Sequence, residues 1–261
     1  MSALQRARAF LRRSRLPTGG WPYVAGGPAQ PEATVLAAAA GPEAEWLDSA
    51  WLSGNEQAWS TFLLPAVAWG RDPALCAPAL DRIEAFRSSP VEGLVGFDAT
   101  LPGWSWVSGT AAWIQPTAFA MLSLRRVGRS PERIEQGVAM IADRQCADGG
   151  WNYGNPEVLG AQLAAHIDST GWALLALPPR EELRPVIERG LAFMTTALTM
   201  PSTMGLALGA LSHLAHGQDP SPFLGGLAER VGDEGVRSRV DLTALAAAAL
   251  SATEEGWNAF L

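Results

Sequence analysis

The chain repeats one kind of helix at a nearly constant interval, and this repeat constrains the fold more than any other feature. Six apolar segments rich in Ala, Leu and Gly each open with a Thr, and these Thr residues recur about every 42 residues, an interval typical of a two-helix repeat. Segments that are apolar nearly all round are expected to be helices buried on several sides. The six segments open with Thr34, Thr61, Thr117, Thr170, Thr203 and Thr243.

The residues just ahead of these segments are of the types that begin helices. A Pro or an Asp precedes five of the six Thr residues, and both types favour a helix start, by a preset backbone angle or by capping. Each Thr is therefore expected in the first turn of an inner helix. The preceding residues are Pro31, Pro116, Asp168, Pro201 and Asp241.

More amphipathic segments alternate with the apolar ones and carry Arg and Glu on one face. This pattern predicts helices that are half exposed, which would form an outer layer around the apolar helices. The amphipathic segments are residues 3–15, 43–53, 73–87, 131–145, 180–197 and 221–231.

Six helical hairpins can stack into an open superhelix or close into a ring. An open array needs polar helices at its ends, whereas the last apolar segment, 243–250, is as apolar as the middle ones. With 48% hydrophobic residues, 17% charged residues and no linker-like stretch, a single folded domain is expected. We therefore predict an all-α fold, an α6/α6 toroid in which residues 1–261 form one closed double ring.

Charge and composition exclude several classes of function. The net charge of −7 argues against a nucleic-acid partner, and the absence of Lys excludes Schiff-base chemistry, although Arg can still hold a diphosphate. Cys76 and Cys146 lie far apart and are expected as small hydrophobes in a reducing compartment. No signal peptide or membrane span is evident, so a cytoplasmic protein is predicted, and the basic amphipathic segment 3–15 allows a peripheral membrane contact.

A second repeated element is a Gly-Trp turn. It occurs in Pro17-Thr-Gly-Gly-Trp-Pro-Tyr23, in Pro102-Gly-Trp-Ser-Trp106, in Arg144-Gln-Cys-Ala-Asp-Gly-Gly-Trp-Asn-Tyr153 and, more weakly, in Glu255-Gly-Trp257. The glycines allow positive φ angles, while the indole can fill the gap between neighbouring hairpins and donate its N–H. The segment from Gln145 to Trp151 closely resembles the QW repeat of the squalene-hopene cyclase and protein prenyltransferase superfamily.

The resemblance implies a toroid whose central cavity binds isoprenoid chains. Class II terpene cyclases of this superfamily protonate an alkene or epoxide with the middle Asp of an Asp-x-Asp-Asp-Thr motif at the head of an inner helix. The matching frame here is His166-Ile-Asp168-Ser-Thr170. Asp168 falls on the acid position, while His166 and Ser169 replace the first and third Asp, so the usual carboxylate cluster is missing. The resemblance thus makes Asp168 the candidate acid, with His166 as its candidate assistant.

Aromatic rings would supply the other half of such chemistry, because their faces stabilise carbocations. Two long connections, near 88–114 and 147–166, are expected to frame the pocket. No cofactor and no metal are expected, and the ligand would be a hydrophobic, isoprenoid small molecule. The candidate substrate-binding residues are Trp106, Trp113, Phe119, Trp151, Tyr153 and Trp172; Trp69 lies on another predicted inner helix.

One further class is disfavoured and two alternatives remain open. A zinc-dependent prenyltransferase would need a Cys, His and carboxylate set, which His213 and His216 alone do not provide. A glycan-processing toroid would use paired carboxylates, for which the candidates are Glu32, Glu56, Asp98, Asp168 and Asp241. A non-catalytic toroid would bind a hydrophobic ligand or a partner protein; squalene-type cyclases have two helical domains and this chain has one, so a partner that completes the site is also possible.

Overall fold

Inner and outer helices alternate along the chain in a computed structural model that describes residues 1–40, 73–91, 96–256 and 260. Apart from a two-stranded sheet and two single turns of 3-10 helix, the regular elements in these ranges are α-helices, which confirms the all-α prediction. The predicted segments 43–53 and from Thr61, with Trp69 and Glu56, lie outside the described residues.

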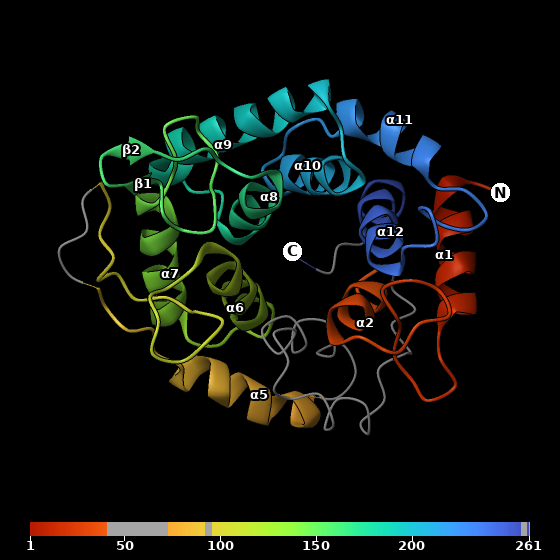
Figure 1. The fold of residues 1–261 in the computed structure, drawn as a ribbon, viewed down its shortest axis with the longest axis horizontal. Helices are drawn as coiled ribbons and strands as arrows, with labels where there is room; N and C mark the ends of the chain where they lie inside the picture. Colours follow the sequence, from red (N-terminus) through yellow and green to blue (C-terminus); the bar gives the residue numbers. More distant parts are fainter. Residues whose placement is uncertain (41–72, 92–95, 257–259, 261) are drawn as a thin grey trace.

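Within the described residues, the inner layer contains five apolar helices that pack side by side. α6 contacts α8, α8 contacts α10, α10 contacts α12 and α12 contacts α2, so these helices form the arc seen nearly end-on in Figure 1. Most of their residues are buried, as the apolar sequence pattern predicts. The inner helices are α2 (Pro31–Ala38), α6 (Ile114–Arg126), α8 (Ile167–Ala176), α10 (Thr203–Ala215) and α12 (Val240–Glu254).

In the part of the chain that the structure describes, five amphipathic outer helices follow the outside of this arc (Figure 1). Each packs its apolar stripe on the inner layer; in the first, Leu4, Ala7, Phe10 and Leu11 are buried at the spacing read from the sequence. The outer helices are α1 (Ala3–Ser14), α5 (Pro73–Ala85), α7 (Pro131–Asp143), α9 (Arg184–Thr196) and α11 (Ser221–Arg230).

The first and last hairpins lie side by side. α1 packs on α12, and α12 packs on α2. The guanidinium of Arg8 forms an ion pair with Glu255 at 2.6 Å, and the Arg6 side chain donates to the carbonyl of Val231 at 2.8 Å. The first and last hairpins of the chain are therefore neighbours in the structure.

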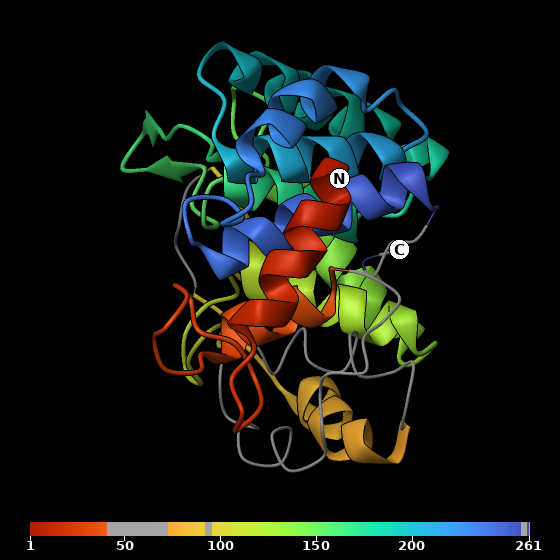
Figure 2. The same cartoon turned by 90° about the vertical axis from the view of Figure 1, so that its right-hand side faces the viewer.

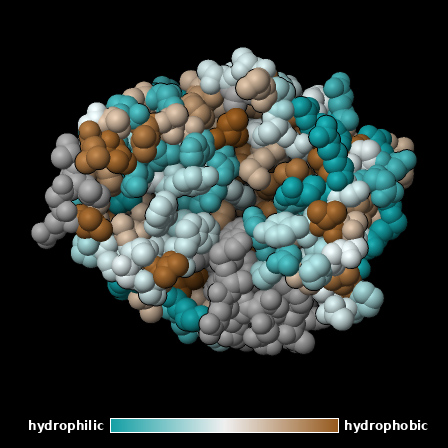
Figure 3. All heavy atoms as spheres, in the orientation of Figure 1, coloured by the Kyte–Doolittle hydropathy of each residue, from teal (hydrophilic) through white to brown (hydrophobic). Residues whose placement is uncertain are grey.

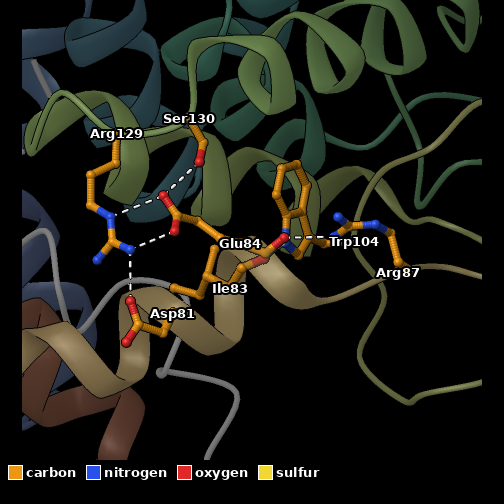
Figure 4. Close-up of polar contacts among 7 residues, drawn as sticks. All are labelled: Asp81, Ile83, Glu84, Arg87, Trp104, Arg129 and Ser130. Carbon is orange, nitrogen blue, oxygen red and sulfur yellow. Dashed lines mark hydrogen bonds and ion pairs between the residues drawn. The ribbon is translucent and has the colours of Figure 1, made fainter.

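α5 buries Leu80 and Ile83 in the core, and polar contacts also attach it to the rest of the structure (Figure 4). Arg129, in the turn between α6 and α7, donates to the carboxylates of Glu84 and Asp81. Ser130 also donates to Glu84, at 2.5 Å. These bonds fix the outer helix against the α6–α7 turn.

The long connections gather at the N-terminal ends of the inner helices. The connection ahead of α8 contains the hairpin of β1 (Glu157–Val158) and β2 (Ala161–Gln162), which pair antiparallel, and it projects on the same side as the loop before α2 (Figure 2). Leu159 at the hairpin tip is fully exposed, and apolar surface gathers over this hairpin in Figure 3. Among the described helices, none combines the length and the apolar character needed to cross a bilayer.

Candidate functional site

Three Gly-Trp turns form the same interlock between an outer helix and the inner helix that follows it. In each turn the indole is fully buried, and its N–H donates to a carbonyl of the outer helix; the Trp151 indole donates to Ile141 at 2.7 Å. The backbone N–H of the same tryptophan donates to the hydroxyl of the repeated Thr; the Trp151 backbone donates to Thr170 at 2.8 Å. The two other copies pair Trp21 with Leu11 and Thr34, and Trp104 with Ile83 and Thr117. The prediction that the indole fills the gap between hairpins and donates its N–H is confirmed.

Glycine precedes the tryptophan because the threonine hydroxyl comes too close for a side chain. A Cβ on Gly150 would stand 2.6 Å from the Thr170 hydroxyl, and one on Gly103 would stand 2.8 Å from the Thr117 hydroxyl. A fourth copy, which the sequence pattern did not show, joins α11 to α12. There Val236 takes the place of tryptophan and donates its backbone N–H to Thr243 at 2.8 Å.

Asp168 lies in the first turn of α8, half-buried, with its carboxylate directed to the neighbouring inner helix. The Gln115 side chain on α6 donates to Oδ2 of Asp168 at 3.3 Å. The sequence-based expectation that Asp168 begins the helix by capping is wrong: His166 is the N-cap residue, and no side chain caps this helix. Among the described residues, the hydrogen bond of Asp168 thus joins α8 to α6.

An aromatic pair lies one helical turn below Asp168 and Gln115. Phe119 follows Gln115 by four residues and Trp172 follows Asp168 by four, so each ring is on the same face of its helix as the polar residue above it. The two rings meet edge to face with centroids 4.8 Å apart. They are 2% and 5% exposed, which makes them part of the apolar interior.

Two further rings extend this pair. Trp106, in the connection before α6 and 40% exposed, meets Phe119 with centroids 6.1 Å apart. Phe260 meets Trp172 with centroids 5.3 Å apart and is buried, and its carbonyl accepts from Arg125 at 3.2 Å. A row of four rings therefore runs from the exposed loop side to the interior.

His166, Tyr153 and Trp113 lie at the N-terminal ends of α6 and α8. The rings of His166 and Tyr153 meet edge to face at 4.6 Å, and the backbone N–H of Ile114 donates to the Tyr153 carbonyl at 3.0 Å. Trp113 is the N-cap residue of α6. Within the part of the chain that the structure describes, no hydrogen bond joins His166 to Asp168. The hydrogen-bond partner of Asp168 is Gln115, a residue that the sequence analysis did not single out.

Trp151 is placed apart from the other candidate substrate-binding residues. Its ring packs against α9, where a Cβ built on Gly190 would stand 2.7 Å from the Trp151 ring and 2.9 Å from Leu174 of α8. With its N–H also engaged, the structure gives Trp151 a packing role between hairpins.

A buried arginine that the sequence analysis quoted only as part of a motif joins the two long connections. Arg144 is 1% exposed, and its Nη1 donates to the carbonyls of Ala112 at 2.6 Å and Gly154 at 3.3 Å. Ala112 precedes Trp113, and Gly154 follows Tyr153. Arg144 therefore holds the backbone beside two of the candidate aromatic residues.

The other described carboxylates suggested for a glycan site all have local partners. Asp241 accepts from the Arg239 guanidinium, at 2.8 Å from Nε, and Glu32 accepts from the hydroxyl of Tyr23. Asp98 accepts from the backbone and hydroxyl of Thr100, which lowers its pKa. These contacts give each group a structural role.

The remaining candidate metal ligands are engaged by the backbone. His213 and His216 on and after α10 each face a carbonyl at 2.8 Å, of Gly209 and Leu174 respectively. Cys146 is a buried free thiol whose pKa is raised by burial. In the ranges that the structure describes, no three His, Cys, Asp or Glu residues come together as a metal site would require.

Comparison with known protein families adds no assignment: no family model matches the chain.

Proposed function

We propose that the chain is a closed α6/α6 toroid of six helical hairpins. Two observations support this proposal. The first hairpin packs on the last through α1, α2 and α12, and the outer helices keep to one side of the inner arc (Figure 1). The sequence of residues 41–72 contains the amphipathic and apolar segments that one more hairpin requires.

Within this toroid we propose a diverged, single-domain, class II terpene cyclase-like activity on an isoprenoid substrate. The observation that carries the proposal is the Asp168–Gln115 hydrogen bond, one helical turn above the Phe119–Trp172 pair. In the reaction, the protonated Asp168 carboxyl gives its proton to an alkene carbon, and the Gln115 amide stabilises the carboxylate that is left. The carbocation then lies near aromatic rings, which stabilise it without acting as strong nucleophiles.

The residues at the entrance have a binding role in this proposal. Trp106, Trp113 and Tyr153, with His166, border the approach to Asp168, and their partly exposed rings give an apolar chain a surface to pass along. No cofactor takes part in this proton-initiated step.

The test is incubation of the full chain with prenyl alcohols, prenyl diphosphates and squalene, followed by product analysis. Asp168→Asn removes the proton donor and keeps the size of the side chain, so products are expected to fall at least a hundredfold. The matched control is Asp241→Asn, which changes the corresponding first-turn residue of α12, paired with Arg239. Equal products from Asp168→Asn and the native chain would contradict the proposal.

A second candidate function is non-catalytic binding of an apolar ligand. It is favoured by the burial of the aromatic pair and by Phe260, which packs on Trp172 where a ligand would have to lie. Under this hypothesis isoprenoids bind without turnover, and Phe260→Ala raises their affinity several-fold because it removes a competing ring. Fluorescence titration of the native and variant chains distinguishes this function from catalysis when it is combined with the product assay.

A further inference from the structure

Among the described residues, one edge of the buried Arg144 guanidinium has no hydrogen-bond partner. Nη1 is engaged by the carbonyls of Ala112 and Gly154, whereas Nε and Nη2 are both buried and form no hydrogen bond. An unpartnered buried N–H costs roughly 1–3 kcal/mol, more on a charged group. A site with two such nitrogens on one side chain therefore needs an explanation.

The two free nitrogens are those that form the side-on edge of the guanidinium. This edge presents two parallel N–H groups at the spacing of two oxygens of a carboxylate or a phosphate, which it binds in a two-point contact. The two hydrogen bonds of Nη1, to the carbonyls of Ala112 and Gly154, form a clamp that holds the guanidinium between the two long connections. Ala112 adjoins Trp113, and Gly154 adjoins Tyr153.

We propose that the Nε–Nη2 edge of Arg144 binds the oxyanion group of a ligand, a phosphate or a carboxylate, at the junction of these two connections. This inference deepens the proposed function, and rests on it for the apolar part of the ligand, because it gives the isoprenoid an anionic head group. This junction lies near Asp168. Ala112 is three residues before Gln115, which donates to Asp168. Tyr153 packs on His166, and His166 is two residues before Asp168.

The surroundings of Arg144 set the conditions for binding. Burial lowers its pKa to about 10, an effect opposed by the negative charges of Asp143 and Asp98, so the side chain is cationic at neutral pH. The Asp143 carboxylate accepts instead from the backbone N–H of Asp98 at 2.8 Å. The ring of Phe97 covers the guanidinium, with its centroid 5.0 Å from the central carbon. A ligand must therefore enter beside Phe97.

The experiment measures the melting temperature of the full chain during titration with sodium pyrophosphate and, separately, sodium acetate, at constant ionic strength. A ligand that binds the folded state raises the melting temperature in a saturable way. The native chain is expected to show saturation by at least one of these anions. Saturation by pyrophosphate identifies a phosphate head group, and saturation by acetate identifies a carboxylate.

Variants connect the effect to the free edge. Arg144→Lys keeps the charge and loses the two-point contact, so the apparent Kd is expected to rise at least tenfold. The matched control is Arg133→Lys: Arg133 also stacks on an aromatic ring, Trp104 at 4.4 Å, but both its terminal nitrogens are engaged, by Gln136 and Phe86. This control is expected to bind as the native chain does.

Phe97→Ala provides a test that leaves the clamp in place. Removing the covering ring is expected to lower the apparent Kd at least threefold, and this result decides the matter if Arg144→Lys does not fold. An absence of saturation in both the native chain and Phe97→Ala, or an unchanged Kd in a folded Arg144→Lys, would overturn the proposal. Because the probes carry no isoprenoid, that failure is separate from a failure of the Asp168 product assay.

Discussion

At the scale of single residues, the fold is held together by buried threonine hydroxyls. Each belongs to the fourth residue of an inner helix, as Thr170 does in α8. The hydroxyl of Thr170 accepts from the Trp151 N–H at 2.8 Å and lies 3.2 Å from the Trp151 carbonyl, to which it donates. Both partners are buried, so no water is at hand to replace the hydroxyl. The repeated Thr is thus explained by the turn it holds at Thr34, Thr117, Thr170 and Thr243, whereas Thr203 is the first residue of α10.

Thr170→Val is expected to destabilise the protein by about 1–3 kcal/mol, because the shape is retained while a buried N–H loses its partner. The free energy of unfolding from denaturant titration measures this. Thr195→Val is the control: Thr195 is an exposed residue whose hydroxyl donates to the Leu191 carbonyl within α9, and a change below about 0.5 kcal/mol is expected. Similar losses in both variants would refute the interlock.

Two buried histidines predict how stability depends on pH. Burial lowers the pKa of both His213 and His216, and the charge of Arg125 lowers that of His216 further. The unfolded chain, with pKa values near 6.5, therefore binds these protons at a higher pH than the folded chain. Stability is fully present above about pH 6.5 and is lost as the pH falls below it.

The measurement is the free energy of unfolding between pH 7.5 and 5. The double variant His213→Gln, His216→Gln is expected to lose less stability than the native chain over this range. An equal slope for the two proteins would show that other groups cause the acid sensitivity.

At the scale of elements, α5 is expected to be the described helix most easily detached. It has few contacts with α6, and its bonds to Arg129, whose pKa they raise, are partly exposed (Figure 4). Glu84→Ala is predicted to cost up to ~1 kcal/mol, less at high salt, since solvent and ions screen such pairs. Hydrogen exchange of α5 measures the loss.

The control is Glu181→Ala, which removes an exposed ion pair with Arg184 inside one segment. This variant is expected to leave the hydrogen exchange of α5 unchanged. Faster exchange throughout the protein in Glu84→Ala, rather than in α5, would contradict a local attachment.

The existence of the helices could be predicted from the sequence because burial leaves a periodic pattern of apolar residues. The residues at which the helices begin and end could be predicted less well. α9 begins at Arg184, after a 3-10 turn at Glu181–Leu183, rather than at residue 180. The β1–β2 hairpin was missed because its turn places Leu159 at a φ of 51°, a conformation that sequence rules assign to Gly or Asn.

The site could be predicted only where one segment carries it. The resemblance at His166-Ile-Asp168-Ser-Thr170 singled out Asp168 as the candidate acid, which stays a prediction, whereas its hydrogen-bond partner Gln115 lies 53 residues away. Their contact depends on the register between α6 and α8, which no local pattern encodes. The same holds for the free edge of Arg144, since its partners come from two connections that only the tertiary fold brings together.

At the scale of the whole molecule, closure predicts that the two ends of the chain share one cooperative structure. The ring of Phe10 on α1 lies where a side chain on Gly235, in the α11–α12 turn, would stand. Phe10→Ala is expected to cost about 3–5 kcal/mol. In a closed ring, hydrogen exchange then accelerates in α6 as well as in α12.

An open superhelix gives a different result, because its repeats contact only their neighbours and the terminal hairpin frays alone. Acceleration confined to α1, α2 and α12 would therefore argue against closure.

The most direct measurement of the central claim is a crystal structure of the full chain with a bound farnesyl-type alcohol. The account predicts a closed ring of six hairpins, with the isoprenoid chain against Phe119 and Trp172 and an alkene carbon within reach of the Asp168 carboxyl. An open array of hairpins, or a ligand bound only on the outer helices, would contradict it.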